Sequence, residues 1–136
     1  MFLKDKVDNT EVYNIGLSDH EGMIKFDGFT CEPDHPDGYS STGIYNIPIK
    51  TLDSFNIENV GLIKIDVEGY EENVLLGGID TIIRNNYPPI LFECWDVDWW
   101  GMTQEKHDRL FNILNSLGYE ILEHWGDHET HLAIHK

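Results

Sequence analysis

Two short apolar runs, residues 62–67 and 90–95, constrain the fold more than any other feature of the sequence. The first run is bounded by Gly61 and Gly69, and the second follows a pair of prolines. Runs of this kind are typical of strands buried on both faces of a sheet. Between them, apolar residues recur at helical spacing: Val74, Leu75, Ile79, Ile82 and Ile83. We therefore predict a strand, a helix and a second strand in a right-handed parallel unit, with residues 62–67 as the central strand.

The rest of the pattern predicts a single domain over residues 1–136. Alternating or β-branched segments predict further strands at residues 11–17, 23–27, 44–49, 119–125 and 130–135, the last two as a hairpin. Helical segments are predicted after the capping residues Thr51 and Thr103, and the 71–83 helix is expected to kink or pack closely at Gly77–Gly78. Residues 28–43 are rich in turn formers and predict a long loop. The predicted fold is a three-layer α/β sandwich with a mostly parallel sheet and an antiparallel C-terminal hairpin.

Charge narrows the range of partners. The 136 residues carry a net charge of −16, from 9 Lys and Arg against 25 Asp and Glu. A field of that sign repels phosphate backbones and anionic headgroups, which argues against nucleic acid and membrane surfaces as partners. The sequence shows no apolar targeting segment, so we expect a cytoplasmic protein. Cys31 and Cys94 fit no disulfide or metal spacing, and we expect both to be free thiols.

Four sequence blocks carry a family resemblance. They are TLDSF at 51–55, LIKIDVEGYE at 62–71, VLLGG at 74–78 and PILFE at 89–93. In this order and at this spacing they resemble the FkbM-type methyltransferases. The segment NIGLSD at 14–19 is similar to the third strand of that family. The resemblance implies a Rossmann-like fold that binds S-adenosylmethionine and transfers its methyl group, usually to a hydroxyl of a sugar or other small molecule.

The resemblance also implies an N-terminal cofactor-binding segment that this sequence does not match. Family members begin with a glycine-rich loop on a helix and a strand ending in an acid that binds the cofactor ribose. We therefore expect a domain truncated at its N-terminus that binds S-adenosylmethionine weakly or not at all, with Ser18, Asp19 and Asp66 as the remaining cofactor contacts. A complementing chain or a homo-oligomer is the expected partner. The 11–17 strand is expected to pair with residues 62–67 or with another molecule.

Three acids are the predicted catalytic residues. Asp66, Glu68 and Glu93 follow or end the two apolar runs, and open α/β sheets place their ligand crevice at the carboxyl ends of such strands. A carboxylate there can orient an acceptor hydroxyl and accept its proton. The structural alternative is that Asp66 is only the partner of Lys64 in a buried ion pair.

The segment after the second run supplies the predicted acceptor contacts Trp95, Asp96 and Trp99. Aromatic faces and carboxylates are the usual contacts of sugars, although an aromatic plug over the core is an equally good interpretation. The histidines of the hairpin do not converge on one face, which argues against a zinc site. A divalent cation at Asp66 and Glu93 is a further alternative.

Three interpretations of the function follow from these observations. The first is an S-adenosylmethionine-dependent O-methyltransferase that acts on a sugar or small-molecule hydroxyl. The second is a non-catalytic binding or interaction module that keeps the acceptor half of that fold. An acidic structural or assembly protein is a third interpretation, supported by the charge alone.

Overall fold

A computed structural model of the chain describes residues 9–26, 45–99, 101–122 and 129–136. Its strands are β1 (Gly16–Leu17), β2 (Gly22–Phe26), β3 (Tyr45–Lys50), β4 (Ile63–Ile65), β5 (Ile90–Glu93), β6 (Tyr119–Leu122) and β7 (Thr130–His135). Its helices are the 3₁₀ helix η2 (Leu52–Phe55) and the α-helices α1 (Glu71–Leu76), α2 (Ile79–Arg84) and α3 (Gln104–Ser116). The predicted 28–43 loop and Cys31 lie outside the described residues, whereas Cys94 is a free, buried thiol as expected.

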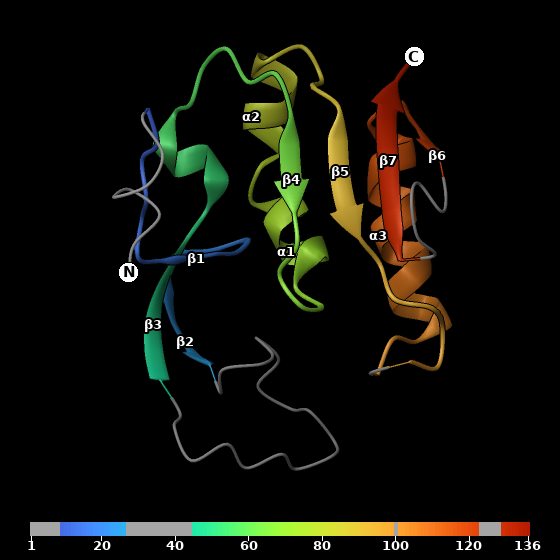
Figure 1. The fold of residues 1–136 in the computed structure, drawn as a ribbon, viewed down its shortest axis with the longest axis horizontal. Coiled ribbons are helices and arrows are strands. Elements are labelled where there is room, and N and C mark those ends of the chain that lie inside the picture. The colour runs from blue at the N-terminus through green and yellow to red at the C-terminus, as the bar shows by residue number, and fades with distance from the viewer. Residues whose placement is uncertain (1–8, 27–44, 100, 123–128) are drawn as a thin grey trace.

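The strands form two separate sheets that stand side by side (Figure 1). The smaller sheet has the order β1-β3-β2, with β1 parallel and β2 antiparallel to β3. The larger sheet has the order β4-β5-β7-β6. In it, β4 and β5 are parallel, whereas β7 runs antiparallel to both β5 and β6, which confirms the closing hairpin.

The helices cover one face of the larger sheet. Figure 1 shows α1, α2 and α3 behind β4, β5 and β7, and no described helix lies on the opposite face. The covered face carries the core, in which Ile65, Phe92 and Ala133 are almost fully buried. On the opposite face the strand register aligns Lys64, Leu91 and Leu132. This difference between the faces leaves the ends of β4 and β5 accessible.

Local sequence signals determine where the helices start and stop. The hydroxyls of Thr51 and Thr103 accept hydrogen bonds from backbone N–H groups at the starts of η2 and α3, which confirms both predicted caps. The predicted 71–83 helix is broken between α1 and α2 at Gly77–Gly78. A Cβ atom at Gly77 would collide with the backbone carbonyl of Ser18, so a glycine is needed for this close approach.

Several fold predictions are corrected by the structure. The 62–67 run is not a central strand buried on both faces: β4 is an edge strand among the described residues, and Lys64 is exposed. The 11–17 segment is a strand only at Gly16–Leu17, and it pairs with β3 rather than with β4. Only two of the five pairings between described strands are parallel, so the mostly parallel sheet is not confirmed, and neither are the three layers. What stands is a mixed α/β fold with two sheets.

None of the described helices is both long enough and apolar enough to cross a bilayer.

Candidate active site

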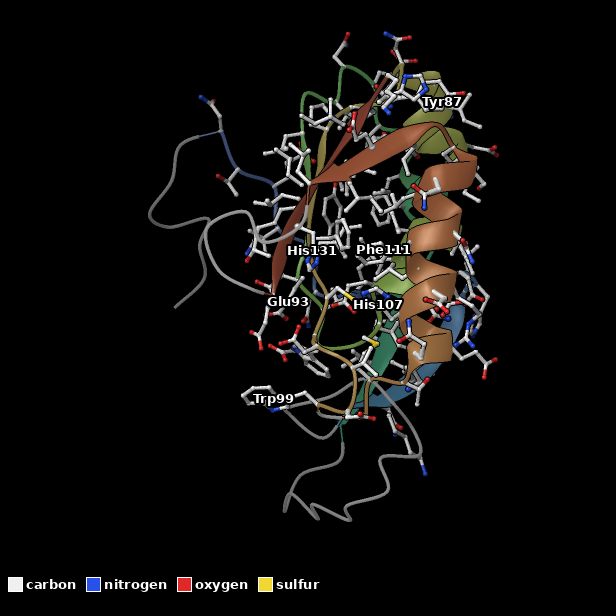
Figure 2. The ribbon with its side chains drawn as sticks, turned by 90° about the vertical axis from the view of Figure 1, so that its right-hand side faces the viewer. Tyr87, Glu93, Trp99, His107, Phe111 and His131 are labelled. Atoms are coloured by element: carbon white, nitrogen blue, oxygen red, sulfur yellow. The ribbon has the colours of Figure 1, made fainter. Side chains whose placement is uncertain are left out.

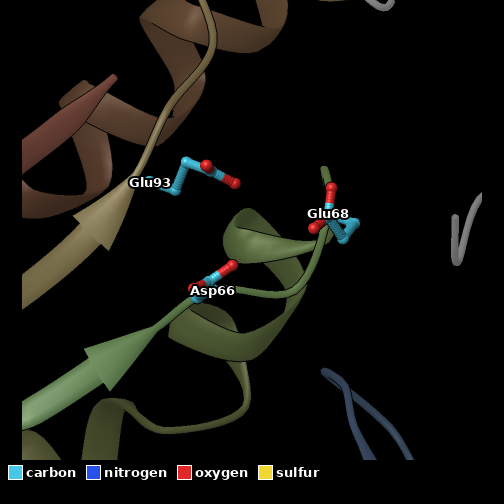
Figure 3. Close-up of side chains that lie close together, drawn as sticks. All are labelled: Asp66, Glu68 and Glu93. Carbon is cyan, nitrogen blue, oxygen red and sulfur yellow. The ribbon is translucent and has the colours of Figure 1, made fainter. Parts of the chain in front are cut away.

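Asp66, Glu68 and Glu93 come together at the carboxyl ends of β4 and β5 (Figure 3). One carboxylate oxygen from each residue lies within 4.8 Å of the others. The parallel pairing of β4 and β5 causes this, because Asp66 directly follows β4 and Glu93 is the last residue of β5. The structure thus assembles the three predicted catalytic acids in one place, which we call the acidic site.

A strained turn places Glu68 in the acidic site. Glu68 has a φ of 54° and Gly69 a φ of 93°, so two consecutive residues are left-handed. This conformation costs a non-glycine residue about 1 kcal/mol. The carboxylate of Glu71 compensates, because its Oε1 accepts hydrogen bonds from the N–H groups of Val67 and Gly69, at 3.2 and 3.3 Å.

Glu93 is the acid whose chemistry the site alters most. Its Oε2 atom is buried and has no hydrogen-bond partner among the described residues. Partial burial, followed by the negative charges of Asp66, Glu68, Glu71 and Glu129, raises the pKa of Glu93 to about 7. A carboxyl group with that pKa exchanges a proton readily near neutral pH, which is what a general base or acid requires.

The Lys64 and Asp66 pair exists, but it is not the buried pair of the structural alternative. Lys64 Nζ lies 2.7 Å from Asp66 Oδ2, and the two side chains are 62% and 44% exposed. The bond to Asp66 raises the pKa of Lys64, so the amine stays charged. Exposed pairs of this kind contribute little to stability, because water screens them. The Lys64–Asp66 pair therefore does not explain why Glu68 and Glu93 lie close to Asp66.

Part of the aromatic segment lies beside the acidic site. A Cβ atom at Gly69 would lie 3.4 Å from the Trp95 ring, so this indole packs against the turn that carries Glu68. The following loop is held by hydrogen bonds of 2.8 Å from Asp98 N–H to the Met102 carbonyl and from Met102 N–H to the Trp99 carbonyl. Trp99 is 50% exposed, and Figure 2 shows its side chain below Glu93 on the same side of the view. Asp96 is exposed as well, and the role of all three predicted residues in acceptor binding stays a prediction.

The predicted cofactor residues Ser18 and Asp19 are not part of the acidic group. Ser18 is fully buried, its N–H donates to the Lys50 carbonyl, and its hydroxyl donates to Asp19. Asp19 is engaged by His20, 2.7 Å away, and this contact lowers the pKa of the Asp19 carboxyl. Their role in cofactor binding stays a prediction, with Asp66 as the one predicted contact that lies in the acidic site.

The residues considered as metal ligands are the hairpin histidines and the acids of the acidic site. His124 and His128 lie outside the described residues. His131 is buried, stacked on Phe92, and contacts the Glu129 carbonyl through Nδ1. Within the described ranges, the acidic site is the only group of three side chains spaced closely enough for a cation. The raised pKa of Glu93 favours a shared proton there, and the divalent cation stays a prediction.

Glu71 is the residue that the sequence interpretation missed. Its position in the first turn of α1 predicts only a favourable interaction with the helix dipole. The structure instead buries it to 3% exposure, where it binds the turn that carries Glu68. The sequence signal for this role is Gly69 followed two residues later by Glu71. At that spacing the Glu71 side chain can reach back to the turn.

Comparison with known proteins assigns the family. The family model of the Methyltransferase FkbM domain matches residues 2–121. The chain belongs to the FkbM methyltransferase domain family. Among solved structures, the FkbM chain resembles methyltransferase FkbM from Methylobacillus flagellatus KT, with a TM-score of 0.59 and 20% sequence identity. The match covers 90% of this chain and 28% of that one, so this FkbM chain spans less than a third of its structural neighbour. No curated protein matches the chain.

Proposed function

We propose that the chain carries the acceptor-binding and proton-accepting part of an S-adenosylmethionine-dependent O-methyltransferase. The acceptor is a hydroxyl of a sugar or another small molecule. The observation that carries the proposal is Glu93, whose pKa of about 7 and buried Oε2 atom, without a hydrogen-bond partner in the part of the chain that the structure describes, suit a general base. Family membership supports methyl transfer as the reaction class.

Each residue of the site has a separate task. The ionised Glu93 carboxylate accepts the proton of the acceptor hydroxyl as that oxygen becomes a nucleophile. Asp66 and Glu68 accept hydrogen bonds from neighbouring hydroxyls and so orient the acceptor. Trp95 and the exposed Trp99 offer ring faces for a sugar to stack on.

The residues in place do not make a complete site for S-adenosylmethionine. Carboxylates suit its positive sulfonium group, but Ser18 is buried and Asp19 is bound to His20. When bound, the cofactor supplies the methyl group. We propose that a complementing polypeptide provides the missing contacts. On its own the chain should bind S-adenosylmethionine no better than about 1 μM, or −8 kcal/mol, by isothermal titration.

The test is a methyl-transfer assay at pH 8 with a panel of neutral sugars and polyols, in which labelled S-adenosylmethionine is supplied at a concentration high enough to offset its weak binding to the chain. We expect Glu93→Gln to lower transfer by about 100-fold, because general bases contribute factors of this size. Glu58→Gln, which removes an exposed charge in a loop, is the matched control and should behave as wild type. Transfer that is equal in wild type and Glu93→Gln would refute the assignment of the base.

The second candidate is a binding module without catalysis. The location of Ser18 and Asp19, and the short span of the match to the neighbour, favour it for the chain alone. Binding of S-adenosylmethionine and methyl transfer distinguish the two candidates. A module binds a sugar but neither binds S-adenosylmethionine nor transfers a methyl group, with or without a complementing polypeptide.

A further inference from the structure

Glu71 is a buried charge that the proposed chemistry does not use. Only 3% of its surface is exposed, although it lies in the first turn of a surface helix. Burial raises its pKa, while hydrogen bonds from the backbone oppose that shift. A buried carboxylate is costly unless it is hydrogen-bonded, so the burial of Glu71 depends on the two groups that donate to it.

Both partners belong to the turn that follows Asp66. Glu71 Oε1 accepts from the N–H groups of Val67 and Gly69, which flank Glu68 on either side. Glu68 itself is left-handed, a conformation that a glutamate adopts only when its surroundings enforce it. A single oxygen atom thus fixes the backbone immediately before and after the strained residue.

The direction of Glu68 depends on this turn. If Glu68 relaxed to a negative φ, the chain would leave β4 along another path and the Glu68 carboxylate would point elsewhere. In the structure it instead lies with Asp66 and Glu93, and these carboxylates repel one another when they are ionised (Figure 3). Neither backbone preference nor electrostatics favours this arrangement, so a separate group must hold it.

We propose that Glu71 is the positioning residue of the acidic site, and that its two hydrogen bonds hold Glu68 against Asp66 and Glu93. The importance of this role for catalysis rests on the proposed function, whereas the positioning itself does not. Glu71 is not a catalytic residue, because it acts only through the turn. The charges of Glu68 and Glu93 and the Cys94 thiol interact with Glu71, and the cations Lys106 and Arg109 line the same pocket as Glu71.

Two variants separate the hydrogen bonds of Glu71 from its charge. Glu71→Gln removes the charge but keeps an oxygen that can accept from Val67 and Gly69. Glu71→Leu removes both. Glu72→Gln is the control, because Glu72 is the next residue of the same helix and pairs with Arg109 instead of the turn.

The first measurement is amide hydrogen exchange. In Glu71→Leu the N–H groups of Val67 and Gly69 should exchange about tenfold faster than in wild type, while the Ile82 amide in α2 keeps its rate. In Glu71→Gln and Glu72→Gln both turn amides should stay as protected as in wild type. Unchanged protection in Glu71→Leu would overturn the proposal. If that variant does not fold, Glu71→Asp, whose side chain is one methylene shorter, gives the same test.

The second measurement is the titration of the Glu93 carboxyl carbon by NMR. Glu71→Gln reports the loss of the Glu71 charge alone, which should lower the Glu93 midpoint. Glu71→Leu should lower it further, because Glu68 then leaves the cluster. Equal midpoints in the two variants would overturn the proposal, since they would show that Glu68 has not moved. Both measurements use the chain without cofactor, so they stand even if the methyl-transfer assay gives no product.

Discussion

The two faces of the larger sheet differ although they are made by alternate residues of the same strands. Along β5, Ile90 and Phe92 point to the helices and are 0% and 1% exposed, whereas Leu91 and Glu93 point to the other face and are only partly buried. The helix-covered face is apolar and closely packed. The other face places Lys64, Asp66 and Glu93 within reach of water and of a ligand.

This difference separates the residues that stabilise the fold from the residues proposed to act on a ligand. Stability comes from the helix side, where Phe92 stacks on His131 and packs edge-on against Phe111. The proposed chemistry belongs to the open side, where acidic groups are held together at some cost in stability. Substitutions at neighbouring residues of one strand should therefore have opposite consequences.

The largest effect should come from Phe92→Ala. Removing a buried phenylalanine leaves a cavity beside His131 and Phe111, and such changes destabilise proteins by about 3–5 kcal/mol. The matched control is Leu91→Ala, one residue earlier on the open face, which should lower stability by about 1 kcal/mol or less. Urea unfolding at constant slope measures both. Equal losses would mean that the open face is covered in solution, and the comparison of the two faces would be wrong.

Much of the fold was predictable from local signals. The caps at Thr51 and Thr103, the break at Gly77–Gly78 and the closing hairpin all depend on residues close in sequence, and the structure confirms them. The strand pairing was not predictable in the same way. An apolar run such as 62–67 indicates a strand but not its neighbours, and β4 lies at the edge of its sheet among the strands that the structure describes. The 11–17 segment pairs with β3, which a pattern of β-branched residues does not encode.

The acidic site was predictable because it follows from a general rule. Parallel strands bring their carboxyl ends to one edge, so Asp66 and Glu93 had to lie close once β4 and β5 paired. The exposure of the Lys64 pair could not be predicted, because it depends on which face the helices cover. The role of Glu71 was also hidden, because it depends on the left-handed φ of Glu68, a feature that favours glycine over glutamate.

A smaller effect is expected at Gly77, where the helix side meets the smaller sheet. Gly77→Ala would push a Cβ atom into the Ser18 carbonyl, and overpacking of this kind costs about 1–3 kcal/mol. Gly61→Ala is the control, because nothing lies within 4 Å of a Cβ atom there. It should change stability by less than about 1 kcal/mol, in either direction. Thermal unfolding of the two variants decides the point, and a neutral Gly77→Ala would show that α1 and Ser18 can move apart freely.

The smallest effect, and the one specific to the open face, is the pH dependence that Glu93 adds. Its pKa in the folded chain is about 7, above that of a glutamate in an unfolded chain, so the folded state binds the proton more tightly. The contribution of Glu93 to stability is therefore full below the unfolded pKa and is lost as the pH rises through about 7. Glu93→Gln mimics the protonated form and should raise stability at pH 8, by less than about 1 kcal/mol because water screens the site. At pH 5 it should match wild type.

The measurement is the difference in urea midpoint between wild type and Glu93→Gln from pH 5 to pH 8, which cancels the titration of the histidines. A difference that stays constant over this range would mean that Glu93 titrates as an ordinary exposed acid, and the open face would then lose the residue on which its proposed chemistry depends.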